Sequence, residues 1–251
     1  MKALITGASS GIGHDLAIVL ALAKKYDELI IVARSLERLQ KLEEELSQLG
    51  QKSIIEIADL TNREACIKLF NNYPDVDLLI NNAGLGDMGY FDETSLDKDL
   101  LQIDTNICAL HILTKLYLGV MTKRDSGHIL NVASIAGFMP GPLMTTYYAT
   151  KNYVVRLSEG IRKELKARRS KVKISILCPG PVSTNFEKTA NITFDFKGIP
   201  SMKVARYTIK HLNRFYIVPG FGIKMGRFMI KIMPTRIVAN FIYHYKNKAK
   251  K

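Results

Sequence analysis

The chain has 251 residues, a length that suits one α/β domain with a full buried core. Apolar residues make up 47% and charged residues 24%, which excludes a disordered, collagen-like or disulfide-scaffolded protein. The net charge of +13 is unevenly placed, because 13 of the 36 lysines and arginines follow Asp195 and no acidic residue does. The basic end of the chain suggests contact with an anionic surface or an acidic ligand.

Cys66, Cys108 and Cys178 are far apart and odd in number, so we expect a reducing compartment rather than disulfides. The histidines show no ligand spacing, and no metal site is expected. The chain opens directly on a strand-like run, and no early apolar stretch approaches the roughly 18 to 20 residues that span a bilayer. Cytoplasmic residence without a transmembrane helix is the resulting expectation.

Short apolar runs alternate with longer amphipathic stretches along most of the chain. One such stretch, at 35–46, has leucines at helical spacing. The alternation predicts a single doubly wound α/β domain of the Rossmann type, with a seven-stranded parallel sheet and helices on both faces. The seven strand-like runs are Lys2–Ile5, Glu28–Val32, Ser53–Ile57, Leu78–Ile80, His128–Val132, Lys173–Leu177 and Arg214–Val218.

A glycine-rich turn follows the first run and precedes an amphipathic stretch at 14–23. Glycines let the backbone bend sharply and let a pyrophosphate approach the N–H groups at a helix N-terminus. The position between strand and helix favours a dinucleotide site over an ordinary glycine-rich turn. The candidate contacts in this turn are Gly7, Ser9, Ser10, Gly11, Ile12 and Gly13.

The spacing T-G-x-x-x-G-x-G resembles the glycine motif of the classical short-chain dehydrogenase/reductase family. Further motifs of that family follow in order: Asn81-Asn82-Ala83-Gly84 after the fourth run, Tyr147 with Lys151 as Y-x-x-x-K, and Pro179-Gly180 after the sixth run. The resemblance covers residues 1–220 and implies an enzyme with a nicotinamide cofactor. It adds as cofactor contacts Asp59, Leu60, Asn82, Ala83, Gly84, Tyr147, Lys151, Pro179, Gly180, Val182 and Thr184. It also implies a homodimer or homotetramer built on helices at 99–121 and 148–167.

The residue that follows the second run decides the expected cofactor. In dinucleotide folds a carboxylate about 20 residues past the glycine turn holds the ribose 2′-hydroxyl, whereas an arginine accommodates a 2′-phosphate. This chain has Arg34 there, and Arg38 about one helical turn later can reach the same side. NADP(H) is therefore expected ahead of NAD(H), and two solvated surface arginines are the alternative.

A tyrosine with a lysine four residues later is a weak signal alone, and its position after a strand that ends near Ser134 strengthens it. We assign Tyr147 as general acid/base and Lys151 as its electrostatic partner, whose ammonium would lower the pKa of the phenol. Ser134 would stabilise charge on the substrate oxygen. By resemblance, Asn106 would orient a water that links Lys151 to solvent; an exposed helix residue is the alternative reading.

The segments that follow the strands are mostly apolar and aromatic, which favours a hydrophobic ketone or secondary alcohol as substrate. The segment 184–200 is long for a loop and is a candidate lid over the substrate. The resulting division places the cofactor-binding and catalytic residues in 1–220. A catalytically silent NADP(H)-binding sensor is the rival from another functional class.

Residues 221–251 form a basic amphipathic extension that Pro234 interrupts. Its apolar face could lie on an anionic membrane, as in a peripheral reductase of lipid-like substrates. The same face could instead pack on the domain or on a second subunit. Its aromatic residues alternate with aliphatic ones as in a packing face, so a nucleic-acid partner is not expected.

Overall fold

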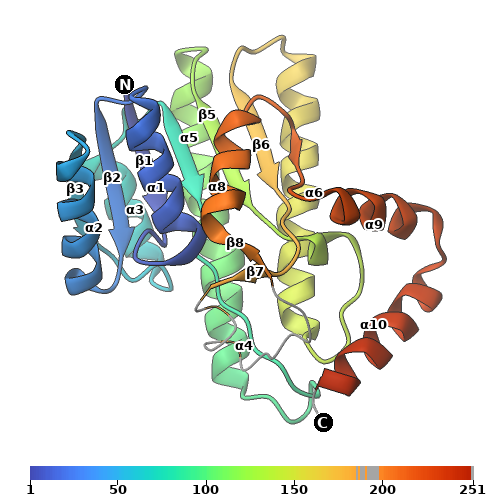
Figure 1. Cartoon of the computed structure of the whole chain (residues 1–251). Coiled ribbons are helices and arrows are strands. Elements are labelled where there is room, and N and C mark those ends of the chain that lie inside the picture. Colours follow the sequence, from blue (N-terminus) through green and yellow to red (C-terminus); the bar gives the residue numbers. More distant parts are fainter. Residues whose placement is uncertain (185, 187–189, 191–197, 250–251) are drawn as a thin grey trace.

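The computed structural model describes residues 1–184, 186, 190 and 198–249 (Figure 1). Seven strands form one parallel sheet in the order β3-β2-β1-β4-β5-β6-β9. Each strand overlaps one of the seven predicted runs, so the predicted doubly wound sheet is confirmed. The strands are β1 (Lys2–Thr6), β2 (Glu28–Ala33), β3 (Lys52–Ile57), β4 (Leu78–Asn81), β5 (His128–Val132), β6 (Lys173–Leu177) and β9 (Tyr216–Ile217).

Helices cover both faces of the sheet (Figure 1). One face carries α1 (Gly11–Ala23), α2 (Leu36–Gln48) and α8 (Ser201–Lys210). The other face carries α3 (Arg63–Asn72), α5 (Leu110–Lys123) and α6 (Thr145–Ala167). The remaining elements include α4 (Leu96–Ile103), a π-helical segment η1 (Asp104–Ala109), a 3₁₀ turn η2 (Ile135–Phe138), and two short paired strands, β7 (Val182–Ser183) and β8 (Ile199–Pro200).

The strands are apolar on both sides because both faces of the sheet are buried. In β1, Leu4 packs into the core cluster under α3, α5 and α6, while Ile5 packs into the cluster under α1, α2 and α8. Their neighbours in β2 alternate in the same way, since Leu4 pairs with Ile30 and Ile5 with Ile31. This two-sided burial fixes the carboxyl ends of the strands, which is where the site is built.

The helix predicted at 99–121 is helical throughout, within a helical stretch that covers 96–123. Its middle is the π-helical segment η1, which separates α4 from α5. A π-helix inserts extra backbone into a turn and changes the direction of the side chains, and such segments occur frequently at functional sites. Here the segment contains Asn106, one of the predicted catalytic residues.

The C-terminal extension forms two helices, α9 (Phe221–Ile232) and α10 (Thr235–Ala249), separated at Pro234 as predicted. In Figure 1, α9 projects beyond the β9 side of the sheet and α10 returns toward the start of α6. Within the described ranges, no helix combines the length and the apolar composition needed to cross a bilayer. The predicted lid at 184–200 lies largely outside the described residues, so its closure stays a prediction.

Candidate active site

A cavity of about 1100 Å³ opens at the carboxyl ends of the central strands, where the sheet order reverses between β1 and β4. It is lined by nearly all of the predicted site residues: Gly7, Ser9, Ser10, Gly11, Ile12, Arg34, Arg38, Asp59, Leu60, Asn82, Ala83, Gly84, Ser134, Tyr147, Lys151, Pro179, Gly180, Val182 and Thr184. Two predicted residues, Gly13 and Asn106, are not part of the lining, but each contacts residues that are.

The glycine turn forms one wall of the cavity. Gly7 and Gly11 adopt φ angles of +64° and +57°, which side chains disfavour. A Cβ on Gly13 would lie 2.3 Å from the Gly7 carbonyl oxygen and 2.4 Å from Nδ2 of Asn82. The turn therefore leaves no room for a side chain at Gly13, and its backbone N–H groups at the start of α1 suit a pyrophosphate.

The loop after β4 holds this turn in place. The Thr6 hydroxyl accepts hydrogen bonds from the backbone N–H groups of Asn82 (3.0 Å) and Ala83 (3.1 Å). The Asn82 amide donates to the carbonyls of Thr6 and Gly7 in return. The sequence predicts Asn82 as a cofactor contact but does not show that its side chain hydrogen-bonds to the turn. It does not single out Thr6 either, because the hydrogen bonds of Thr6 join β1 to the loop after β4.

The far end of the cavity carries charged side chains after β2 and β3. Arg34 and Arg38 are exposed and line the cavity beside Asp59. The Asp59 carboxylate accepts from the backbone N–H (3.1 Å) and hydroxyl (2.9 Å) of Thr61. This end can hold a nucleotide whose phosphate faces the two guanidinium groups.

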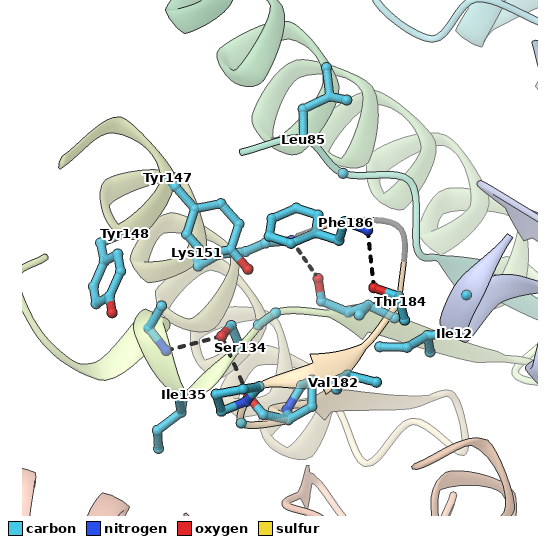
Figure 2. A pocket seen from close by; sticks show the side chains of 18 of the residues that line it. Ile12, Leu85, Ser134, Ile135, Tyr147, Tyr148, Lys151, Val182, Thr184 and Phe186 are labelled. Atoms are coloured by element: carbon cyan, nitrogen blue, oxygen red, sulfur yellow. Dashed lines mark hydrogen bonds between the residues drawn. The ribbon is translucent and has the colours of Figure 1, made fainter. Parts of the chain in front are cut away.

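The predicted acid/base group lies at the start of α6. Tyr147 and Lys151 are one helical turn apart, and Lys151 Nζ is 5.8 Å from the centre of the Tyr147 ring. That ammonium is buried and donates to the Val132 carbonyl at 3.0 Å. Ser134 follows β5, and its hydroxyl accepts from the backbone N–H of Ala136 at 3.2 Å. Figure 2 shows these side chains around one pocket.

Burial is the main cause of the pKa shifts of Tyr147 and Lys151. It raises the pKa of the Tyr147 phenol to about 12, against a smaller lowering by the Ser134 hydroxyl. It also lowers the pKa of the Lys151 ammonium to about 8. The lowering of the tyrosine pKa by Lys151 stays a prediction. Burial disfavours the charged form of each side chain, the phenolate of Tyr147 and the ammonium of Lys151.

Asn106 lies close to the predicted catalytic residue Lys151. Its side chain is buried and exchanges two hydrogen bonds with the backbone of Leu85, donating to the carbonyl at 2.9 Å and accepting from the N–H at 2.8 Å. It also donates to the Thr150 hydroxyl at 3.0 Å. The reading of Asn106 as an exposed helix residue is wrong, and the predicted water link to Lys151 stays a prediction.

Gly84 shows how closely this group is packed. A Cβ there would lie 3.3 Å from both Asn106 Oδ1 and Lys151 Nζ. A side chain at this position would require Asn106 or Lys151 to shift slightly.

The other end of the cavity is apolar. Tyr148, Met144 and Phe186 surround Tyr147, whose ring centre lies 5.4 Å from that of Phe186. The sequence reasoning missed that α9 and α10 close this end, because an amphipathic pattern does not say which surface a helix meets. The two C-terminal helices contribute Gly222, Ile223, Gly226, Met229, Ile230, Val238, Phe241, Ile242, Tyr245 and Lys246.

The outer face of α9 is unexpectedly apolar. Phe221 is 79% exposed and Phe228 59%, and Met225 and Ile232 lie exposed on the same helix. The contacts with the domain are made partly by Arg227, whose guanidinium lies over the rings of Phe138 and Tyr216. These four apolar side chains do not pack on the described part of the domain, so a membrane or a second subunit remains as their predicted partner.

A sequence profile described as short chain dehydrogenase matches residues 1–193. The chain belongs to this family. An uncharacterized oxidoreductase of Staphylococcus saprophyticus is 36% identical over 186 residues, which is 72% of this chain and 74% of the relative. The human dehydrogenase/reductase SDR family member 11 is 34% identical over 196 residues, 73% of this chain and 74% of its own.

Solved structures agree with this assignment. A short-chain dehydrogenase from Sphingobium yanoikuyae in complex with NADPH superposes with a TM-score of 0.82 at 26% identity, covering 93% of this chain and 96% of that one. As a short-chain dehydrogenase, the chain is a nucleotide-binding oxidoreductase with a Rossmann fold. The family profile ends at residue 193, so the helices α9 and α10 lie beyond it.

Proposed function

We propose that this short-chain dehydrogenase transfers a hydride between NADP(H) and a hydrophobic ketone or secondary alcohol, with Tyr147 as general acid/base. One observation carries the proposal. The acid/base group formed by Tyr147, Lys151 and Ser134 opens into the same cavity as the glycine turn and Arg34. A nucleotide on the turn and a carbonyl beside Tyr147 can therefore occupy one continuous space.

The residues after β2 support NADP(H) ahead of NAD(H). Arg34 and Arg38 line the cavity there, and no carboxylate that would favour a free 2′-hydroxyl follows β2 directly. The glycine turn, Asn82 and Lys151 would hold the rest of the cofactor.

The bound nicotinamide would supply or accept the hydride. During reduction the Tyr147 hydroxyl gives its proton to the substrate oxygen, and the Ser134 hydroxyl hydrogen-bonds the same oxygen as negative charge develops on it. The Lys151 ammonium stabilises the phenolate that remains on Tyr147. During oxidation the phenolate takes the proton back from the alcohol.

A panel of apolar ketones and keto esters, followed by the absorbance of NADPH, tests this function. We expect turnover of at least some apolar members and little with small polar carbonyls, since the lining beyond Tyr147 is apolar. The silent-sensor alternative predicts tight NADPH binding with no consumption for any member. Binding without turnover across the panel would therefore favour the sensor.

We also propose that the enzyme is a homodimer or homotetramer that uses the α5 and α6 surface. The adjoining helix α4 leaves Leu96 (71% exposed) and Leu100 uncovered, as expected at a contact between subunits. Sedimentation velocity measures the mass directly. Leu100→Glu should lower the measured mass if the surface of α5 and α6 forms the interface.

A peripheral membrane contact is the second candidate, and it concerns where the enzyme works. The exposed apolar side chains of α9 lie among Lys224 and Lys231, in a region without any acidic residue. Met229 and Phe241 are both exposed and line the cavity. An anionic membrane fits this combination, and lipid-like ketones could then enter the cavity from the bilayer.

A further inference from the structure

Lys246 lies where a cation is unexpected. It belongs to α10, yet its side chain is only 7% exposed and lines the apolar end of the cavity. Its ammonium lies 3.8 Å from the centre of the Tyr148 ring and donates to the Pro142 carbonyl at 3.3 Å. Both partners are uncharged. A lysine ammonium has three donors, so the contacts within the described residues satisfy it only in part.

The charges around the cavity are unbalanced. Its described charged residues are Arg34, Arg38, Asp59, Lys151 and Lys246. The single carboxylate in that set, Asp59, follows β3 at the opposite end of the cavity. Burial of Lys246, which has no acidic partner among the described residues, lowers the pKa of its ammonium to about 7. A buried cation of this kind is stabilised when a ligand brings the missing negative charge.

Lys246 lies near the predicted acid/base residue Tyr147, with Tyr148 in contact with both. The Tyr148 ring separates it from Tyr147, whose ring centre is 6.1 Å from that of Tyr148. A substrate with its carbonyl at Tyr147 and an apolar body past Tyr148 would therefore extend directly to the ammonium.

Building on the function proposed above, we propose that Lys246 binds a carboxylate and that the substrates are apolar keto acids or hydroxy acids. The carboxylate completes the hydrogen bonds of the ammonium, while the hydrocarbon body fills the space lined by Met144, Phe186 and Ile242. Among the described residues one cation lines this end, and it matches a monoanion. Lys246 is thus a specificity-determining residue, and α10 carries it to the site from a region beyond the family profile.

The kinetic test compares straight-chain keto acids of increasing carbonyl-to-carboxylate separation with the methyl ester of each acid. We expect the wild type to prefer one range of acids over their esters. Lys246→Met should lower kcat/KM for those acids about 10- to 100-fold through KM, and leave the esters within about twofold. Lys246→Arg should retain most of the preference. Lys231→Met, which removes an exposed lysine of α9, is the matched control and should change neither.

A binding test separates this inference from the proposed function. Decanoate and decanol are titrated calorimetrically into the wild type and into Lys246→Met, with circular dichroism to confirm that the variant is folded. The wild type should bind decanoate more tightly than decanol, and the variant should lose that difference. If no ketone is turned over but decanoate still depends on Lys246, the catalytic proposal fails and the carboxylate site stands.

Two results would overturn the carboxylate site. One is a wild type that does not distinguish acids from esters or decanoate from decanol. The other is a Lys246→Met variant that weakens acids and esters equally, which would mean that Lys246 only fastens α10 to the start of α6.

Discussion

Tyr147 is the residue on which the proposed chemistry depends. Its hydroxyl is the proposed proton donor to the substrate, while its ring contributes to the cavity wall. Tyr147→Phe removes the hydroxyl and keeps the ring, so turnover should fall at least about 100-fold while NADPH binding is preserved. Steady-state kinetics and NADPH fluorescence titration measure the two effects. Turnover within about tenfold of the wild type would exclude Tyr147 as the proton donor.

The burial of the Lys151 ammonium leads to a separate prediction about the stability of the protein. Its pKa is about 8 in the folded protein against a usual 10.5, so folding below pH 8 must keep a poorly solvated ammonium buried. This destabilising contribution is fully present below about pH 8 and disappears as the pH rises toward 10.5, where the unfolded chain also loses the proton. Lys151→Met should therefore raise the free energy of unfolding by about 1 to 3 kcal/mol at pH 7.

Urea unfolding of the cofactor-free protein at pH 7 and pH 10 tests whether Lys151→Met raises the free energy of unfolding as predicted. The gain from Lys151→Met should shrink strongly at the higher pH. The reason is that the wild type no longer carries the buried charge there. A gain that is the same at both pH values would point to packing instead of ionisation.

Arg34 should set the cofactor preference. A charge-assisted contact to phosphate is worth roughly 1.5 to 3 kcal/mol, or about 10- to 150-fold in affinity. Arg34→Ala should weaken NADPH by that factor and leave NADH nearly unchanged. Lys41→Ala removes a nearby exposed cation that does not line the cavity and serves as the control. Equal losses for both cofactors would show that Arg34 does not contact the 2′-phosphate.

At the scale of elements, the turn between β1 and α1 is the least tolerant part of the site. A Cβ on Gly13 would collide with the Gly7 carbonyl and with Asn82, so Gly13→Ala should abolish measurable NADPH binding and lower the melting temperature. Gly160→Ala is the matched control, because nothing lies within 4 Å of the added methyl group in α6. It should stabilise the protein by about 0.5 to 1 kcal/mol through helix propensity. A tolerated Gly13→Ala would contradict the tight packing.

The elements also show which features a sequence can reveal. Most strands are buried on both faces and produce continuous apolar runs; the alternation of such runs predicted all seven strands, including the partly exposed edge strand β3. Motif spacing predicted Tyr147 and Lys151. The π-helical segment around Asn106 could not be predicted, because it arises from how α4 and α5 meet the loop at Leu85. Lys246 could not be distinguished from the other basic residues of the tail, since its burial depends on where α10 docks.

At the scale of the whole molecule, two parts of the chain line the cavity. The sheet and its loops provide the glycine turn, the two arginines and the acid/base group, all of which lie within residues 1–193. Helices α9 and α10 close the apolar end from beyond the matched family profile. We therefore expect the first part to determine the reaction and cofactor, and the second to determine the substrate and the surface on which the enzyme works.

The surface of α9 allows that expectation to be tested on the intact protein. If it lies on a membrane, the protein should sediment with vesicles that contain phosphatidylglycerol and not with pure phosphatidylcholine. Salt should release it, because attraction of about 1 kcal/mol per basic residue is screened within a Debye length. A double variant, Phe221→Ser with Phe228→Ser, should lose sedimentation and keep its kcat, since neither side chain lines the cavity.

Leu22→Ser is the matched control for that variant. Leu22 is 53% exposed but belongs to α1, so its replacement should leave vesicle binding unchanged. If the α9 surface is instead a contact between subunits, the double variant should lower the mass measured by sedimentation velocity, and vesicles should have no effect at any salt concentration. That pair of results would contradict the membrane proposal, because the exposed apolar side chains would then be covered by a second copy of the chain.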